Sequence, residues 1–151
     1  MTDQYDSIDS HIPTAGDMEK ACTPLGMLMA WCANLRLLSA AVEQEQEQLL
    51  LRIRVQEVSG ADLLVACGGA LKREHLNLRG QQFMDGYFPE FLADYAATLG
   101  SDIYAAENNW TNYSALATVL TRRLMHAEGH SAAARRNGKS SWVQRLVDRW
   151  R

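Results

Sequence analysis

The stretch "TPLGMLMAWCANLRLL" (residues 23–38) is almost continuously apolar and decides how the fold is organised. Thr23 supplies a capping hydroxyl, and Pro24 suits the first position of a helix, where its missing N–H costs nothing. A helix that is apolar most of the way round lies in the centre of a fold, because no face of it suits water. We therefore expect a central helix that begins at Thr23-Pro24.

The segment before this helix, residues 1–22, is polar and shows no helical period. Asp3, Asp6, Asp9 and His11 could in principle surround a cation. A calcium loop, however, places its acids at alternate positions, with a glycine at the sixth and a glutamate at the twelfth, whereas these acids are three apart. We expect an extended acidic arm that is solvated or docks a partner, and not a metal site.

The segment after the central helix contains good helix formers, and we expect a second helix over residues 42–58. Within it, "LRIRV" alternates in the manner of a strand, so that reading stays open. Ser59 is a suitable cap for a third, short helix that runs through Cys67, and Gly68-Gly69 is expected to end it.

The second half of the chain has two longer helical patterns. Residues 74–100 have apolar side chains mostly three or four apart, with Asn77 as a cap, Pro89 as a break and Gly100 as a stop. Residues 110–130 form an amphipathic stripe. A basic linker and a short terminal helix follow over residues 132–151.

Together these patterns predict an all-α, single-domain bundle of five or six helices with an extended N-terminal arm. The single domain spans residues 1–151, with the arm over 1–22, a helical body over 23–131 and the basic linker and terminal helix over 132–151. At 151 residues and 47 % hydrophobic content the chain is large enough to bury a core.

Charge and cysteine content limit the class of protein. Residues 1–110 hold sixteen acidic against seven basic side chains, a balance of −9, whereas residues 111–151 hold two against eight, a balance of +6. The three cysteines are odd in number and have no paired spacing, which is typical of reduced core thiols. The N-terminus lacks the pattern of a signal peptide, and no apolar run reaches about 18 residues, so we expect a cytoplasmic protein.

The sequence gives little support for catalysis. It has no G-x-S-x-G motif and no Gly-rich phosphate loop, and its cysteines lie in apolar contexts that raise a thiol pKa. His126 and His130 are four apart, as two zinc ligands on a helix would be, but no third ligand is evident. We expect a protein that is not an enzyme and that binds neither a cofactor nor a metal.

Two segments could recognise a partner. "DIYAAENNWTNYSAL" (residues 102–116) combines asparagines, tyrosines and a tryptophan, residue types that are common at interfaces, although the same residues could cap and pack the helix that begins there. The basic tail could face phosphates or a membrane, but Trp142, Leu146 and Trp150 are four apart, which favours packing onto the bundle.

Several motifs resemble those of a family of small uncharacterised bacterial proteins of helical fold. They are the G-M-x-x-A-W pattern in "LGMLMAW", the segments "RVQEVSGADL" and "LNLRGQQF", and the W-x-N-Y pattern in "WTNY". Such proteins are found beside bacterial toxin genes. The resemblance implies an immunity protein that neutralises a cognate toxin of type VI or contact-dependent secretion, and it implies no catalytic residue. The "EQEQEQ" stretch and the basic linker depart from the family pattern.

These observations lead to one functional hypothesis and one alternative. The hypothesis is an immunity protein whose acidic body binds a basic toxin, for example a nuclease, since opposite charges steer association. Its partner-binding residues are expected among Asp85, Glu90, Asp94, Asp102, Tyr104 and Glu107. The alternative is a small adaptor or nucleic-acid-associated protein that uses its basic C-terminal tail.

Overall fold

The computed structural model describes the backbone of residues 3–149 and the side chains of residues 3–129. The chain forms two compact units, one that ends at Leu120 and one that begins at Thr121. The first unit contains all helices from α1 to α7, the start of α8 and a small two-stranded sheet. The mostly helical fold predicted from the sequence is confirmed.

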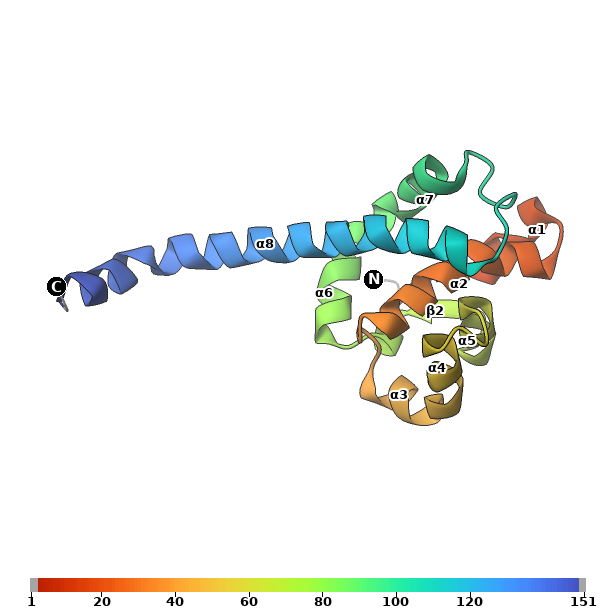
Figure 1. Ribbon diagram of the computed structural model, residues 1–151, viewed down its shortest axis with the longest axis horizontal. Helices are drawn as coiled ribbons and strands as arrows, with labels where there is room; N and C mark the ends of the chain where they lie inside the picture. The colour runs from red at the N-terminus through yellow and green to blue at the C-terminus, as the bar shows by residue number, and fades with distance from the viewer. Residues whose placement is uncertain (1–2, 150–151) are drawn as a thin grey trace. The chain divides into compact units, whose positions relative to one another are not determined.

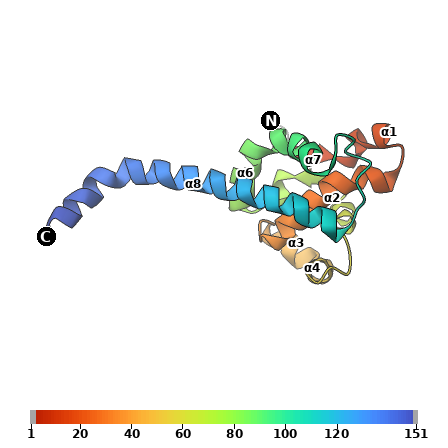
Figure 2. The same ribbon diagram turned by 45° about the horizontal axis from the view of Figure 1, so that its top comes forward.

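Helix α2 (Met18–Asn34) lies in the middle of the first unit, with α3, α4 and α5 on one side of it and α7 on the other (Figures 1 and 2). Every residue of α2 from Ala21 to Ala33 is buried, which confirms its predicted central position. Its predicted start is wrong, because Asp17 caps the helix by accepting the Lys20 backbone N–H at 2.8 Å. Pro24 therefore lies inside α2.

Helix α5 (Gly60–Ala66) begins after its predicted cap, Ser59, and its backbone crosses that of α2 at very short distance. Ser59 and Asp62 form a capping box at its start. A Cβ atom on Gly60 would lie 1.8 Å from the carbonyl oxygen of Gly26, and one on Gly26 would lie 2.8 Å from the backbone nitrogen of Ala61. The two glycines thus set the distance between the two helix backbones.

The predicted extended arm is wrong, because residues 4–15 form a strand and two short helices that are part of the first unit. Strand β1 (Gln4–Ser7) pairs antiparallel with β2 (Ala70–Lys72), and a 3-10 helix, η1 (Ile8–Ser10), leads into α1 (Ile12–Ala15). Ile8 is buried. A polar segment without helical period can still be ordered when a distant strand satisfies its backbone groups.

The predicted second helix over residues 42–58 consists of two shorter helices, α3 (Ala40–Glu45) and α4 (Glu47–Arg54), which are separated at Gln46. "LRIRV" is part of α4 and not a strand. Gln56, just beyond α4, has a left-handed backbone with φ of 62°. The break lets Val42, Leu50 and Ile53 reach the core from two short helices.

The segment from 73 to 100 forms two short helices and two longer ones. They are η2 (Arg73–His75), α6 (Leu78–Tyr87), η3 (Phe88–Glu90) and α7 (Phe91–Leu99). The Asn77 side chain accepts the Gly80 backbone N–H at 2.9 Å, which confirms the predicted cap, and the predicted break at Pro89 falls in η3. The Phe83 ring of α6 packs against Trp31 of α2, with the ring centroids 5.5 Å apart.

Helix α8 (Trp110–Arg149) begins where the sequence predicts a long helix, and its backbone is helical through the predicted basic linker. The alanines and arginines of that stretch are strong helix formers, and a glycine in a helix costs only about 1 kcal/mol. Predictions about the side chains of the basic tail, from His130 on, lie outside the described residues.

Candidate functional site

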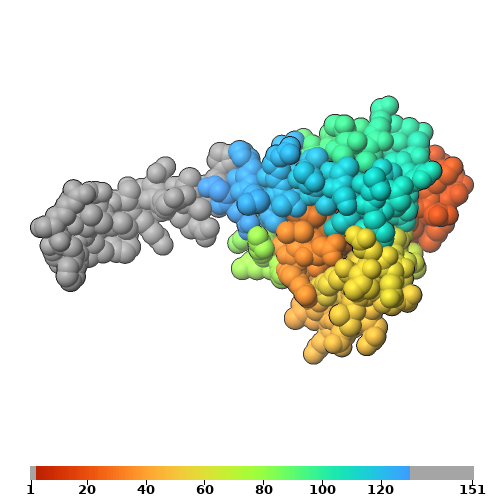
Figure 3. Space-filling model, in the orientation of Figure 1, coloured from red at the N-terminus to blue at the C-terminus, as the bar shows by residue number. Residues whose placement is uncertain are grey.

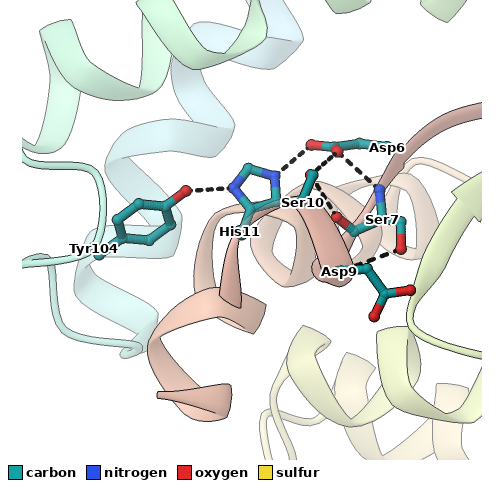
Figure 4. Close-up of polar contacts among 6 residues, drawn as sticks. All are labelled: Asp6, Ser7, Asp9, Ser10, His11 and Tyr104. Carbon is teal, nitrogen blue, oxygen red and sulfur yellow. Dashed lines mark hydrogen bonds and ion pairs between the residues drawn. The ribbon is translucent and has the colours of Figure 1, made fainter. Parts of the chain in front are cut away.

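A hydrogen-bonded chain of Asp6, His11 and Tyr104 joins the N-terminal segment to the loop between α7 and α8 (Figure 4). The Nε2 atom of His11 lies 2.6 Å from Oδ2 of Asp6, and its Nδ1 atom lies 2.5 Å from the Tyr104 hydroxyl. His11 is 5 % exposed. The Asp6 carboxylate accepts from Nε2 of His11, and the Tyr104 hydroxyl, which can both donate and accept, completes the hydrogen bonding of the ring at Nδ1.

The N-terminal segment holds Asp6 in place from its other side. The backbone N–H of Ser7 and the hydroxyl of Ser10 both donate to Oδ1 of Asp6, at 2.8 and 2.9 Å. Asp9 lies in the same turn, but its carboxylate points away from His11 (Figure 4). The chain of three side chains is therefore anchored in η1 and reaches a residue 93 positions away.

The order carboxylate, imidazole and hydroxyl matches that of a charge relay, but the hydroxyl here is poorly suited to attack a substrate. Burial, and then the charges of Asp6 and Asp102, raise the pKa of Tyr104 above its ordinary value. Tyr104 consequently stays protonated near neutral pH. Asp6, His11 and Tyr104 thus clamp the loop to the N-terminal segment.

Next to this clamp, an acidic groove of about 340 Å³ opens between α2 and the loop. One wall consists of residues from the start of α2, namely Asp17, Glu19, Lys20 and Thr23. The other wall is the loop segment 104–108. Asp17, Glu19 and Glu107 bring three carboxylates to the groove, whereas Lys20 brings one ammonium group, so the groove suits a cationic ligand.

The loop wall joins α5 beyond the groove. The side-chain amide of Asn108 donates to the Ser59 hydroxyl at 3.2 Å. Figure 3 shows this junction, where residues at the start of α8 meet residues of α5 on the visible face. Asn109 caps α8 by accepting the Asn112 backbone N–H at 2.8 Å, so part of the asparagine-rich stretch serves to start the helix.

A second groove, of about 650 Å³, lies beside β1 and η3 and contains one of the predicted partner-binding residues. The Asp85 carboxylate accepts a hydrogen bond from the Tyr5 hydroxyl at 2.5 Å and forms an ion pair with Arg73 at 3.0 Å. Hydrogen bonds from Arg73 and then Tyr5 lower the pKa of Asp85. The charge of Asp85 is thus offset within the chain.

The six predicted partner-binding residues fall into two groups. Asp102, Tyr104 and Glu107 lie on the loop between α7 and α8, and Tyr104 and Glu107 line the acidic groove. Asp85, Glu90 and Asp94 lie on α6, η3 and α7. Asp94 accepts a hydrogen bond from the Tyr87 hydroxyl at 2.8 Å. Only the first group is brought together with further acidic side chains.

Sequence reasoning missed the contribution of Asp17 and Glu19 to the groove and the role of His11. The pattern "GDMEK" (residues 16–20) carries a signal for the first two, because an Asp followed by an acidic first turn marks a helix start. No local signal marks His11, since its partner Tyr104 lies far away in the sequence.

Two features of the described residues bear on metals and membranes. Among residues whose side chains the structure describes, no three His, Cys, Asp or Glu side chains come together as a metal site would require. In the same part of the chain, no helix combines the length and apolar character needed to cross a membrane.

Comparisons with known proteins give a family but no characterised relative. A search of curated proteins and a search of solved structures found no match. A family model described as a domain of unknown function (DUF7832) matches residues 3–108, which include Asp6, His11, Tyr104 and the acidic groove. Because this match covers more than half of the chain, the protein belongs to the DUF7832 family.

Proposed function

We propose that the protein is an immunity protein that binds and neutralises a cognate secreted bacterial toxin in the cytoplasm. The observation that carries the proposal is the acidic groove between the start of α2 and the loop segment 104–108. It would receive a lysine or arginine side chain from a basic toxin of type VI or contact-dependent secretion. A nuclease fits this description, because enzymes that act on nucleic acids attract phosphates with basic surfaces.

The charge of the whole matched region supports the same partner. Residues 3–108 hold sixteen acidic and seven basic side chains, so the region that contains the groove has a net negative charge. The field of such a charge accelerates encounter with a basic protein and is screened by salt. The proposal therefore implies association that is fast at low ionic strength and slower at high ionic strength.

Neutralisation by binding requires no catalysis, and we propose that the protein performs none. Burial raises the pKa of Cys32 to about 12 and that of Cys67 to about 11, so both thiols are poor nucleophiles near neutral pH. Tyr104 likewise keeps its proton. These properties support a binding role for the polar side chains of the first unit.

The proposal is tested by looking for a toxin-like reading frame beside this gene and expressing its product in bacteria, with and without the chain. We expect the chain to restore growth and to copurify with the toxin-like protein. Growth arrest in the presence of abundant, folded chain would contradict the proposed function. A neighbouring gene without toxicity of its own would remove its main premise.

Charge reversal tests the groove. Glu19→Lys with Glu107→Lys changes two exposed wall residues and leaves the Asp17 cap intact. The matched control is Glu45→Lys with Glu47→Lys, which changes the net charge equally at α3 and α4. We expect the groove variant to slow association at low salt by about 10-fold and the control to have a much smaller effect. Equal effects would refute the groove as the docking site.

A further inference from the structure

We propose that Asp6 and His11 are positioning residues for the acidic groove: through Tyr104 they hold the loop in the arrangement that the partner binds. This inference rests on the proposed function, because it assigns a role to residues behind the same groove. It concerns side chains that do not line the groove themselves, apart from Tyr104.

The loop needs a tether, here the hydrogen bonds from Tyr104 through His11 to Asp6, because it lacks regular structure of its own. It connects Leu99 of α7 to Trp110 of α8, and Asp102, Ala105 and Glu107 on it are exposed. An exposed connection of this kind samples many conformations unless contacts restrict it. If the loop moves, the wall that carries Glu107 moves away from the wall that carries Glu19.

Two side-chain hydrogen bonds connect the loop to distant parts of the first unit. Asn108 donates to Ser59 at 3.2 Å, and a second hydrogen bond joins Tyr104 to His11 at 2.5 Å. The second contact is the better protected, because His11 is buried and is itself fixed by Asp6. A buried ring nitrogen that loses its hydrogen-bond partner is costly, which favours the arrangement of the loop in which Tyr104 contacts His11.

Preorganisation gives the tether a functional consequence. When only a fraction of molecules has the binding-competent loop, the apparent Kd rises by the reciprocal of that fraction. Loosening the loop therefore weakens binding without changing any charge that faces the partner. This separates the tether from the groove: loss of the tether lowers the association rate by the same factor at every salt concentration, whereas charge reversal changes the salt dependence.

The first test needs no partner and uses hydrogen exchange of the full-length chain. Tyr104→Phe removes one hydroxyl and keeps the ring. We expect exchange of the Tyr104 and Ala105 amides, which donate to Asp102 within the loop, to accelerate about 10-fold or more, while amides of α2 at the Gly26 crossing keep their wild-type rates. Unchanged exchange in the loop would overturn the tether.

Two pairs of variants separate hydrogen bonding from packing. His11→Gln supplies an amide that can donate to Asp6 and accept from Tyr104, and we expect it to restore slow loop exchange relative to His11→Leu. Asp6→Asn should accelerate loop exchange, whereas Asp9→Asn, the same change on the neighbouring acid, should not. Equal behaviour within either pair would overturn the role assigned to the hydrogen bonds.

The second test measures association of Tyr104→Phe with the neighbouring toxin-like protein at several salt concentrations. We expect about a 10-fold slower association with an unchanged salt dependence. A loosened loop with wild-type association would overturn the positioning role. Failure of the wild-type chain to bind would instead refute the proposed function, while the exchange data would still decide whether the tether exists.

Discussion

The crossing of α2 and α5 gives the sharpest prediction about the fold. A methyl group added at Gly60 would meet the Gly26 carbonyl oxygen at 1.8 Å, the Gly26 carbonyl carbon at 2.7 Å and the Ala30 Cβ at 2.8 Å. Two of these atoms belong to the backbone of a buried helix, so no side chain can turn aside to make room. The helices must separate, which opens the buried contact between α2 and α5.

We therefore expect Gly60→Ala to lower the free energy of unfolding by about 3 kcal/mol or more, at the upper end of the usual cost of overpacking. For a chain of this size the melting temperature should fall by roughly 6–12 °C. Gly86→Ala is the matched control, because Gly86 lies in α6 with no neighbouring atom within 4 Å of the added methyl group. It should raise stability by about 0.5–1 kcal/mol.

Thermal and urea unfolding, followed by circular dichroism, measure both variants against the wild-type chain. The two substitutions are chemically identical, so opposite signs would isolate the effect of the helix crossing. If Gly60→Ala unfolds within about 1 kcal/mol of the wild type, the close approach of α2 and α5 does not constrain the fold and the reasoning is refuted.

Three further predictions concern single side chains. Burial lowers the pKa of His75, whose Nδ1 accepts the Lys72 backbone N–H at 3.0 Å. The free energy of unfolding should therefore fall as the pH drops below about 6.5, the pKa of histidine in the unfolded chain. His75→Gln should make the free energy of urea unfolding less dependent on pH between about pH 5 and 7. Cys32 is fully buried and Cys67 is half-buried, so a thiol reagent should modify Cys67 first and reach Cys32 only on unfolding, as mass spectrometry can show. Gln56→Gly should stabilise the chain by about 0.5–1 kcal/mol, because it relieves a left-handed backbone at a non-glycine residue; a loss of stability in urea unfolding would speak against strain there.

Local signals in the sequence were sufficient for much of the helical fold. Ser59, Asn77 and Gly68-Gly69 act on backbone groups only a few residues away, and all of them have the predicted roles at helix ends. The start of α2 was missed because two start signals compete there. The Asp17 cap starts the helix about a turn and a half before Pro24, which lacks the N–H that would donate to the Lys20 carbonyl within a helix.

Contacts between residues that are far apart along the chain could not be predicted from the sequence. The pairing of β1 with β2 joins residues more than sixty positions apart, and it orders a segment that has no helical pattern. The clamp from His11 to Tyr104 spans a still longer separation. Such pairings depend on the fold as a whole, so neither composition nor periodicity can indicate them.

In the candidate site, too, residue types could be predicted from the sequence, whereas their neighbours in the fold could not. Tyr104 and Glu107 were predicted from residue type and charge, and they line the acidic groove. Asp85 was predicted on the same grounds, yet its carboxylate already forms an ion pair with Arg73 and a hydrogen bond with Tyr5. An acidic residue contributes to a docking surface only when its charge is not already offset within the chain, and that depends on neighbours that the fold supplies.

We propose that a basic partner docks in the acidic groove. Hydrogen exchange of the chain, alone and in complex with the neighbouring toxin-like protein, tests this most directly. We expect new protection at residues 17–23 and 104–108, the two walls of the groove. Protection confined to α3 and α4, with both walls exchanging as in the free chain, would contradict it.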